Sequence, residues 1–167
     1  MGWQEVDLAN PQSHYARAKY AADLAIQDLP NTTILRLRMP ISPINHPRNL
    51  INKLQNYNQI LNVSNSVSFL DDIVRCIDWV IQKELTGIYN CTNPGVLAAT
   101  DIMQEFQKYA PKHQFKTISE KELNEFVVAK RSNCILDCNK LFNTGFLMEL
   151  ANIKLKSCME EYIKTLI

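Results

Sequence analysis

The sequence predicts an α/β protein, because helical patterns alternate with short apolar strand patterns along most of the chain. An alanine-rich helical stretch at 13–28 is followed by the apolar run 33–38, which is typical of a buried parallel strand. The chain has 167 residues, 46% of them hydrophobic, and this is enough to bury one substantial core. We therefore expect one compact unit without room for a second large domain.

The first third of the chain is expected to contain a helix, a strand and a shaped loop. Residues 1–12 form an irregular lead-in, and Ser13 caps the helix, which ends before Pro30. After the strand, three prolines hold 39–48 as a rigid loop. Loops at the carboxyl ends of strands in open α/β sheets are common ligand sites, so this loop is a candidate part of one.

The later elements are predicted from periodicity, capping residues and turn signals. Thr100 is expected to cap a helix, and Asn93-Pro94-Gly95 is a turn. In chain order the predicted elements are a helix at 48–54, strands at 59–63 and 67–69, an amphipathic helix through 73–81, a strand at 87–92, a helix at 101–109, a strand at 115–118, a capping box at 119–122, a short helix around 140–142 and a helix at 153–166.

Composition and charge exclude several classes of function. The formal net charge is +1 and the charges are mixed, so nothing indicates binding to nucleic acid or to an anionic membrane. No signal peptide or 18-residue apolar run occurs, and we expect a soluble cytoplasmic protein. The five cysteines include no Cys-x-x-Cys, and the three histidines lie far apart, so neither a disulfide framework nor a metal site is expected.

The pair Tyr15 and Lys19 is the main candidate for catalytic chemistry. Four residues separate them, so they lie on one helical face about one turn apart. A protonated lysine beside a tyrosine favours the phenolate, and the pair can then move a proton onto or off a carbonyl or alcohol oxygen. A chance Tyr-x-x-x-Lys has a prior of roughly one half in a chain with this residue usage, so the interpretation depends on the motifs that come after the helix.

Two other basic residues are candidates with ordinary alternatives. Leu50, Ile51 and Leu54 predict a short helix on which Asn49 and Lys53 share the opposite face. Without further information, Lys53 is most simply a solvated surface lysine. Arg131 has the forked donors that suit a diphosphate, but it equally fits an ordinary surface arginine.

Several motifs together resemble a known enzyme family. They are Tyr15-x-x-x-Lys19, 37–42 (Leu-Arg-Met-Pro-Ile-Ser), 47–49 (Pro-Arg-Asn), 85–95 (Leu-Thr-Gly-Ile-Tyr-Asn-Cys-Thr-Asn-Pro-Gly) and 131–137 (Arg-Ser-Asn-x-x-Leu-Asp). From about residue 5 to its end the chain resembles the C-terminal half of the bifunctional UDP-4-keto-6-deoxy-D-glucose 3,5-epimerase/4-reductases. These enzymes make UDP-L-rhamnose, are close to dTDP-4-dehydrorhamnose reductase and belong to the extended short-chain dehydrogenase/reductases.

The resemblance implies a fold and a division of the chain. Residues 1–42 would be the end of a Rossmann domain, with its last helix and the following strand. Residues 43–167 would form a small α/β region that binds the nucleotide-sugar, with some elements returning to the Rossmann sheet. The N-terminal Gly-rich half of that Rossmann domain is absent from this sequence, whose four glycines are widely separated.

The resemblance also implies roles for particular residues. Tyr15 would protonate the sugar's 4-keto oxygen, Lys19 would lower the tyrosine pKa and bind the nicotinamide ribose of NADPH, and Lys53 would be the acid/base of epimerisation. The family's partner cysteine precedes the tyrosine helix, and no cysteine of this chain does. The implied NADPH contacts are Tyr15, Lys19, Pro40 and Ile41, and the implied nucleotide-sugar contacts are Asn49, Lys53, Arg131, Ser132 and Asn133.

Without a Gly-rich cofactor cradle, the chain alone is expected to be inactive. It would act with a companion Rossmann half, or as a homo-oligomer that covers the exposed apolar surface. One alternative is a non-catalytic module that binds a nucleotide-sugar or another protein. Another is a dTDP-4-dehydrorhamnose reductase, since the residues do not separate UDP from dTDP.

Overall fold

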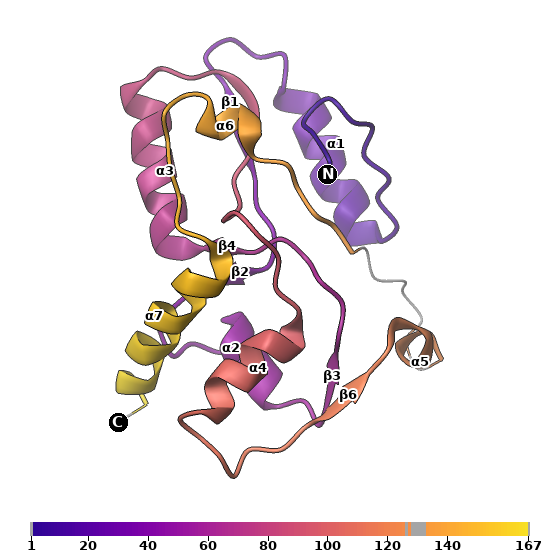
Figure 1. Cartoon of the computed structure of the whole chain (residues 1–167). Helices are drawn as coiled ribbons and strands as arrows, with labels where there is room; N and C mark the ends of the chain where they lie inside the picture. The colour runs from indigo at the N-terminus through magenta and orange to yellow at the C-terminus, as the bar shows by residue number, and fades with distance from the viewer. Residues whose placement is uncertain (1, 126, 128–132, 167) are drawn as a thin grey trace.

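The computed structural model describes residues 2–125, 127 and 133–166, and it is an α/β protein (Figure 1). None of its described helices is long and apolar enough to cross a membrane. In chain order the elements are α1 (His14–Ile26), β1 (Thr33–Arg36), β2 (Pro40–Ile41), α2 (Leu50–Gln55), β3 (Gln59–Leu61), β4 (Ser68–Phe69), α3 (Leu70–Gln82), β5 (Gly87–Asn90), α4 (Ala99–Gln107), β6 (Lys116–Ile118), α5 (Glu120–Asn124), α6 (Asn139–Phe142) and α7 (Ala151–Lys164).

The described strands form three short parallel pairs. β1 pairs with β5, β2 with β4, and β3 with β6. In the first pair Thr33 lies opposite Gly87 and Arg36 opposite Asn90. Parallel strands need a crossover connection, and α3 is the helix that leads into β5. The parallel pairing confirms the predicted α/β architecture.

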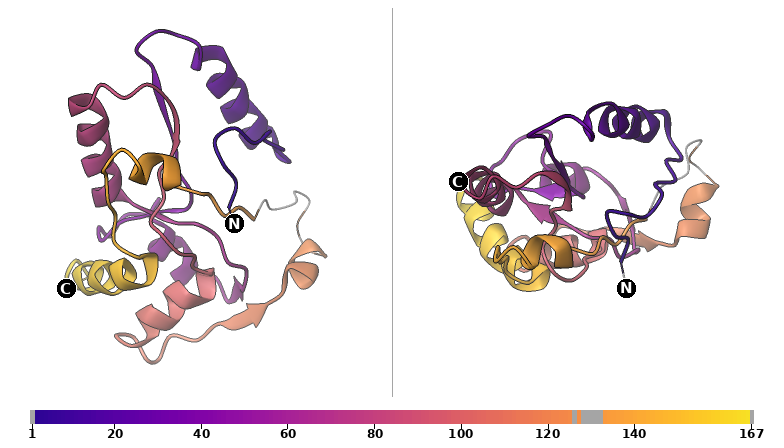
Figure 2. Two further views of the ribbon diagram at one scale, coloured as in Figure 1. Left: turned by 45° about the horizontal axis from the view of Figure 1, so that its top comes forward. Right: turned by 90° about the horizontal axis from the view of Figure 1, so that it is seen from above.

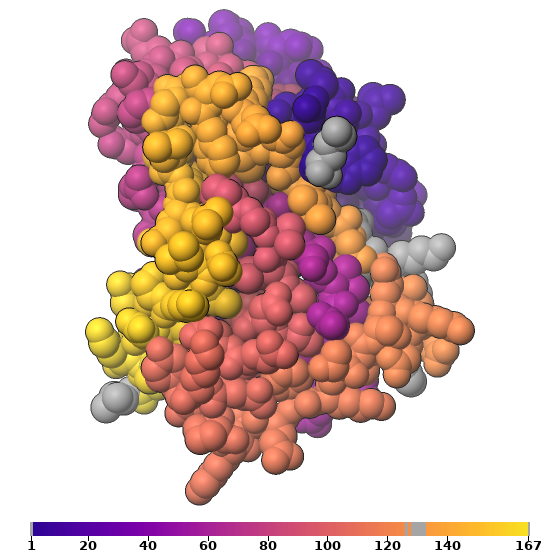
Figure 3. Space-filling model, in the orientation of Figure 1, coloured from indigo at the N-terminus to yellow at the C-terminus, as the bar shows by residue number. Residues whose placement is uncertain are grey.

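A larger hydrophobic core lies between α2, α4 and α7 and the short strands β2, β3 and β4. Figure 3 shows α7, in yellow, packed beside α4 on the outside of this core. The core residues with no exposed surface are Ile41, Ile51, Val67, Phe69, Ile102, Met103, Ala151, Met159 and Tyr162. They come from both halves of the sequence, so this core joins the middle of the chain to its C-terminal helix.

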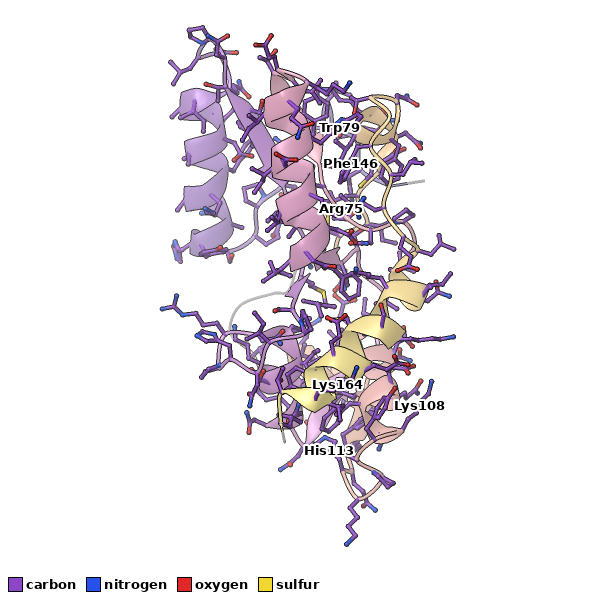
Figure 4. All side chains as sticks on the ribbon, turned by 90° about the vertical axis from the view of Figure 1, so that its left-hand side faces the viewer. Arg75, Trp79, Lys108, His113, Phe146 and Lys164 are labelled. Atoms are coloured by element: carbon purple, nitrogen blue, oxygen red, sulfur yellow. The ribbon has the colours of Figure 1, made fainter. Side chains whose placement is uncertain are left out.

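A smaller core lies where α3 packs against β5 and α6. Its buried residues include Cys76, Tyr89 and Leu141. At its edge the Arg75 guanidinium lies 5.5 Å from the centre of the Phe146 ring, and the Trp79 and Phe146 rings are 6.1 Å apart (Figure 4). The indole Nε1 of Trp79 donates a hydrogen bond to Thr144 Oγ1 at 3.0 Å. These contacts fix the loop after α6 against α3.

The structure corrects two details of the predicted elements. Ala98, and not Thr100, is the N-cap of α4, while the Thr100 hydroxyl lies in the first turn and donates to Asn62 Oδ1. α3 buries Ile73 and Val80 as expected, yet two other apolar residues of its predicted stripe, Ile77 and Ile81, are exposed. Their exposure leaves an apolar surface beside the β1–β5 pair.

Candidate functional site

The predicted catalytic pair lies on α1, at the first two turns of the helix. Ser13 caps the helix by accepting a hydrogen bond from the Ala16 amide at 3.1 Å, so Tyr15 and Lys19 follow one turn apart on one face. The Tyr15 side chain is 75% exposed, and Lys19 is exposed. Within the described part of the chain neither side chain has a hydrogen-bond or ion-pair partner, so both are available to a ligand.

Polar contacts hold α1 and the lead-in to the ends of β1 and β5. Arg36 at the end of β1 donates from Nε to Asp23 Oδ2 at 3.2 Å and from Nη1 to the Glu5 carbonyl at 3.3 Å. The Glu5 carboxylate in turn accepts from the Asn90 amide at the end of β5, at 2.8 Å. Figure 1 shows that α1 begins near the level at which β1 ends. The pair therefore lies near the carboxyl ends of parallel strands, where open α/β sheets bind ligands.

The two predicted nicotinamide contacts differ in exposure. Pro40 is exposed, whereas Ile41 has no exposed surface and belongs to the larger core. Both residues form β2, which pairs with β4, and Met39 before them has a positive φ of 43°. Because neighbouring side chains of a strand point to opposite faces, Ile41 enters the core and Pro40 stays at the surface.

Asn49 holds the loop before α2. Its Nδ2 donates to the carbonyls of Ser42 at 2.7 Å and Ile44 at 2.9 Å, and its Oδ1 accepts from the Ser42 amide at 3.3 Å. It is buried and precedes the helix with an extended ψ of 140°, so it does not share a helical face with the exposed Lys53. The structure thus places Asn49 in a supporting position and leaves Lys53 accessible.

The third candidate stretch is described only in part. Arg131 and Ser132 lie outside the described residues. Asn133 is half-buried, and its Nδ2 donates to Glu120 Oε1 at 2.8 Å. After it, the chain runs beside the N-terminal segment, since Trp3 forms a parallel bridge with Leu136; Figure 3 shows the indigo and orange segments in contact.

A polar junction that the sequence analysis did not single out joins two of these segments. Arg38 donates to Asn65 Oδ1 from Nε at 3.3 Å and from Nη2 at 2.7 Å, and the Cys134 amide donates to the same oxygen at 2.9 Å. One signal was available in the sequence: Asn65-Ser66 interrupts the apolar residues of two predicted strands with amide and hydroxyl groups. Their partners lie 27 and 69 residues away, so the pattern alone did not reveal the junction.

A surface hollow of about 390 Å³ lies beside this junction. Burial raises the pKa of the Cys134 thiol, and the nearby Arg38 guanidinium opposes part of that effect. The thiol therefore stays protonated at neutral pH and is a poor nucleophile. The lining residues are Gly2, Trp3, Ser64, Asn133, Cys134 and Ile135.

A dinucleotide needs a Gly-rich turn whose amides approach its diphosphate. The glycines of this chain are at positions 2, 87, 95 and 145, so no such turn occurs in its sequence. Gly95, with φ 95°, serves the turn after β5. The sequence of this chain therefore does not supply a cradle for the diphosphate of a dinucleotide.

Comparison with curated proteins finds plant sugar-nucleotide enzymes, although no family model matches the chain. The bifunctional dTDP-4-dehydrorhamnose 3,5-epimerase/dTDP-4-dehydrorhamnose reductase of Arabidopsis thaliana is 34% identical over 170 residues, covering 99% of this chain and 56% of the relative. A trifunctional UDP-glucose 4,6-dehydratase/UDP-4-keto-6-deoxy-D-glucose 3,5-epimerase/UDP-4-keto-L-rhamnose-reductase of the same plant is 34% identical over 144 residues, covering 84% of this chain and 22% of the relative. The chain thus spans about half the length of the first relative and about a fifth of the second.

Solved structures of similar enzymes have the same fold. The UDP-rhamnose synthase of Acanthamoeba polyphaga mimivirus matches with a TM-score of 0.87 and 26% identity, covering 96% of this chain and 57% of that structure. The dTDP-4-dehydrorhamnose reductase of Bacillus anthracis, solved with NADP, matches with a TM-score of 0.78 and 19% identity, covering 98% and 59%. The fold is therefore that of the C-terminal part of extended short-chain dehydrogenase/reductases.

The sequence identity to the plant enzymes assigns the chain to one family within this superfamily. The chain belongs to the UDP-rhamnose synthase/dTDP-4-dehydrorhamnose reductase family and aligns with a C-terminal portion of its members.

Proposed function

We propose that this chain forms the nucleotide-sugar-binding half, with part of the catalytic machinery, of an NADPH-dependent 3,5-epimerase/4-reductase that makes UDP-L-rhamnose from UDP-4-keto-6-deoxy-D-glucose. The observation that carries the proposal is the exposed Tyr15 and Lys19 pair, held near the carboxyl ends of β1 and β5. The relatives' activities support it, since the mimivirus enzyme is a UDP-rhamnose synthase and the plant enzymes are 3,5-epimerase/reductases.

The chemistry assigns a role to each exposed side chain. Reduction of the 4-ketone needs a hydride, which NADPH supplies when bound, and a proton for the oxygen, which Tyr15 donates. Lys19 stabilises the resulting phenolate by its charge. Epimerisation needs removal of protons next to the ketone and their return on the opposite face, and Lys53, exposed on α2, is the proposed acid/base for this step.

The proposed nucleotide-sugar contacts lie along 39–49, on α2 and in the stretch after α5. Lys53, Arg131, Ser132 and Asn133 contact the ligand directly in this proposal. Asn49 contributes by shaping the loop, because its side chain is buried and bonded to the Ser42 and Ile44 backbone. UDP is the proposed nucleotide, and dTDP, which marks a dTDP-4-dehydrorhamnose reductase, is the alternative.

We further propose that residues 1–42 belong to a Rossmann unit that a Gly-rich dinucleotide-binding half completes, on this or another polypeptide. Three observations support this. Among the described strands β1 pairs only with β5, which leaves its other edge open, and α1 has no buried residue. A hollow of about 650 Å³ between β1 and α3 is lined by apolar residues including Leu35, Ile77 and Val80. Parallel sheets are normally covered on both faces, so this surface suits a further layer.

A second candidate function is a binding module without turnover. The absence of a Gly-rich turn from the sequence of this chain favours it for the chain taken alone. Such a module would bind a nucleotide-sugar, or a partner protein through the exposed face beside β1, without oxidising NADPH. A second copy of the chain covering that face would give a homo-oligomer.

Calorimetric titration of the purified chain with UDP, dTDP and NADPH in turn tests the binding proposal. We expect UDP to bind and NADPH not to bind. Tight NADPH binding by this chain would overturn our account of where the cofactor is held. If neither UDP nor dTDP binds, the chain has no nucleotide-sugar site of its own.

Reconstitution with a separately produced Gly-rich half tests the catalytic proposal. We expect consumption of NADPH with UDP-4-keto-6-deoxyglucose only when both halves are present. Tyr15→Phe should lower this rate by about 10²- to 10⁴-fold, because it removes the proton donor. Tyr57→Phe, at another exposed tyrosine, is the control and should leave the rate unchanged. A binding module would bind UDP but would not consume NADPH, with or without the Gly-rich half.

A further inference from the structure

The side chain of Asn65 takes part in four hydrogen bonds. The residue is buried, with 5% of its surface exposed. Its Oδ1 accepts three hydrogen bonds, from Arg38 Nε, Arg38 Nη2 and the Cys134 amide, and its Nδ2 donates to the Val63 carbonyl at 3.2 Å. Its backbone pairs in both directions with Leu97. The pairing with Leu97 fixes the backbone of Asn65, and the side-chain amide of Asn65 holds Arg38 and the Cys134 amide in place.

Asn65 and Ser66 hold the start of the chain segment that follows Asn133, and Trp3 pairs with its later residues. The Cys134 amide donates to Asn65 Oδ1 at 2.9 Å, the Ser66 amide donates to the Cys134 carbonyl at 3.0 Å, and the Leu136 amide donates to Ser66 Oγ at 2.9 Å. Ser66 is buried as well. These three bonds determine where the backbone emerges toward Asn133.

The same amide also holds the segment that follows β1. Arg38 lies two residues before Pro40, and its own amide donates to Ser68 Oγ at 3.1 Å. Asn65 is therefore the point at which the loop that reaches Pro40 and the segment that reaches Asn133 are joined. Ser64 and Cys134, on either side of this junction, line the adjacent 390 Å³ hollow.

We infer that Asn65 is a positioning residue that sets the segment 134–136, which follows the proposed ligand contact Asn133, relative to the loop at 38–41. This inference rests on the proposed function, since it takes 133 as part of the ligand site. An asparagine suits the position because it offers an acceptor to Arg38 and Cys134 and a donor to Val63 on one short side chain. Leucine has a similar volume and offers neither, whereas aspartate keeps the acceptor.

The first experiment needs no ligand. In Asn65→Leu, hydrogen exchange at the Cys134 amide should become about tenfold faster or more, because its acceptor is lost. In Asn65→Asp it should stay within about threefold of the wild type. The control is Trp79→Phe, on α3 (Figure 4), which removes the hydrogen bond from Trp79 Nε1 to Thr144 Oγ1 and should leave exchange at Cys134 unchanged. Equal exchange in Asn65→Leu and wild type would overturn the positioning role, whatever the chain binds.

The second experiment measures UDP affinity by calorimetry in the same variants. We expect about tenfold weaker binding in Asn65→Leu, and recovery to within about threefold of wild type in Asn65→Asp. Ser66→Ala removes the hydrogen bond that Ser66 Oγ accepts from the Leu136 amide. This milder change tests the inference if Asn65→Leu does not fold, and it should weaken UDP binding by about two- to fivefold. Wild-type affinity in Ser66→Ala and in a folded Asn65→Leu would overturn the inference. If the wild type itself does not bind UDP, the proposed function fails instead, and the exchange result still stands.

Discussion

The region around the larger core and the region around β1 and β5 differ in how completely they cover their apolar residues. In the first, three helices enclose short strands, and residues such as Phe69 and Met159 have no exposed surface. In the second, α1 buries none of its residues and α3 exposes Ile77 and Ile81. Figure 2, in the view from above, shows α1 at the edge of the molecule, away from α7. The first region encloses its strands between helices, whereas the second leaves apolar residues of α3 exposed beside a pair of parallel strands.

The largest expected effect comes from a cavity in the enclosed region. Phe69→Ala should lower the free energy of unfolding by about 3–5 kcal/mol, because a fully buried ring is lost. Ile81→Ala, at a residue 69% exposed on α3, is the matched change in the open region and should cost under about 0.5 kcal/mol. Urea unfolding of both variants checks this. Comparable losses would mean that the α3 surface is already covered in solution.

The free energy of unfolding should fall at alkaline pH because of Cys158, a buried thiol in the larger core. Burial raises the pKa of Cys158 from its ordinary 9.0 to about 12. In the unfolded chain this thiol ionises near pH 9 while the folded chain keeps it protonated, so the stability present below pH 9 is lost as pH rises toward 12. The loss should be about 2–4 kcal/mol, on the order of 1.4 kcal/mol per pH unit.

Cys158→Ala isolates this contribution. The variant should be less stable at neutral pH by about 1 kcal/mol, and between about pH 9 and pH 12 it should lose less stability than the wild type. Thermal unfolding across this range provides the measurement. An unchanged alkaline loss in the variant would assign it to other groups, such as the buried Cys138, whose pKa burial also raises.

Asn93 joins the two regions, and its substitution should lower the free energy of unfolding. Its Nδ2 donates to Asp72 Oδ2 at 2.6 Å and to the Glu149 carbonyl at 3.1 Å, and its Oδ1 accepts from the Phe69 amide at 3.1 Å. Asn93→Ala leaves the buried Asp72 without this donor and should cost about 1–3 kcal/mol. Asn56→Ala, which removes one exposed hydrogen bond, should cost about 0.5 kcal/mol or less in the same denaturation experiment. Equal costs would contradict a special role of Asn93 between the regions.

The smallest expected effect is confined to α1. Ser13→Ala removes the helix cap and should destabilise α1 locally by about 1 kcal/mol, seen as faster hydrogen exchange in its first turns. Because α1 contributes no buried residue, global unfolding should hardly change. Ser119→Ala removes the same kind of cap from α5 and is the comparison. A large global loss in Ser13→Ala would show that α1 is packed more tightly than its exposure indicates.

Much of the fold was predictable from local signals. The cap at Ser13, the capping box of α5 and the apolar run into β1 all act within a few residues, and each element formed close to its predicted place. The prediction that Thr100 caps α4 was wrong, because the Asp101 carboxylate accepts a hydrogen bond from the Ala98 amide and the helix begins two residues earlier.

By itself the sequence determined the alternation of helices and strands and the single helical face shared by Tyr15 and Lys19, because periodicity and capping depend on near neighbours. Only the tertiary structure decided that Asn49 turns inward and that Asn65 gathers Arg38 and Cys134 around one oxygen. The donors that bind a buried side-chain amide come from segments distant in sequence, so a local sequence pattern does not predict them.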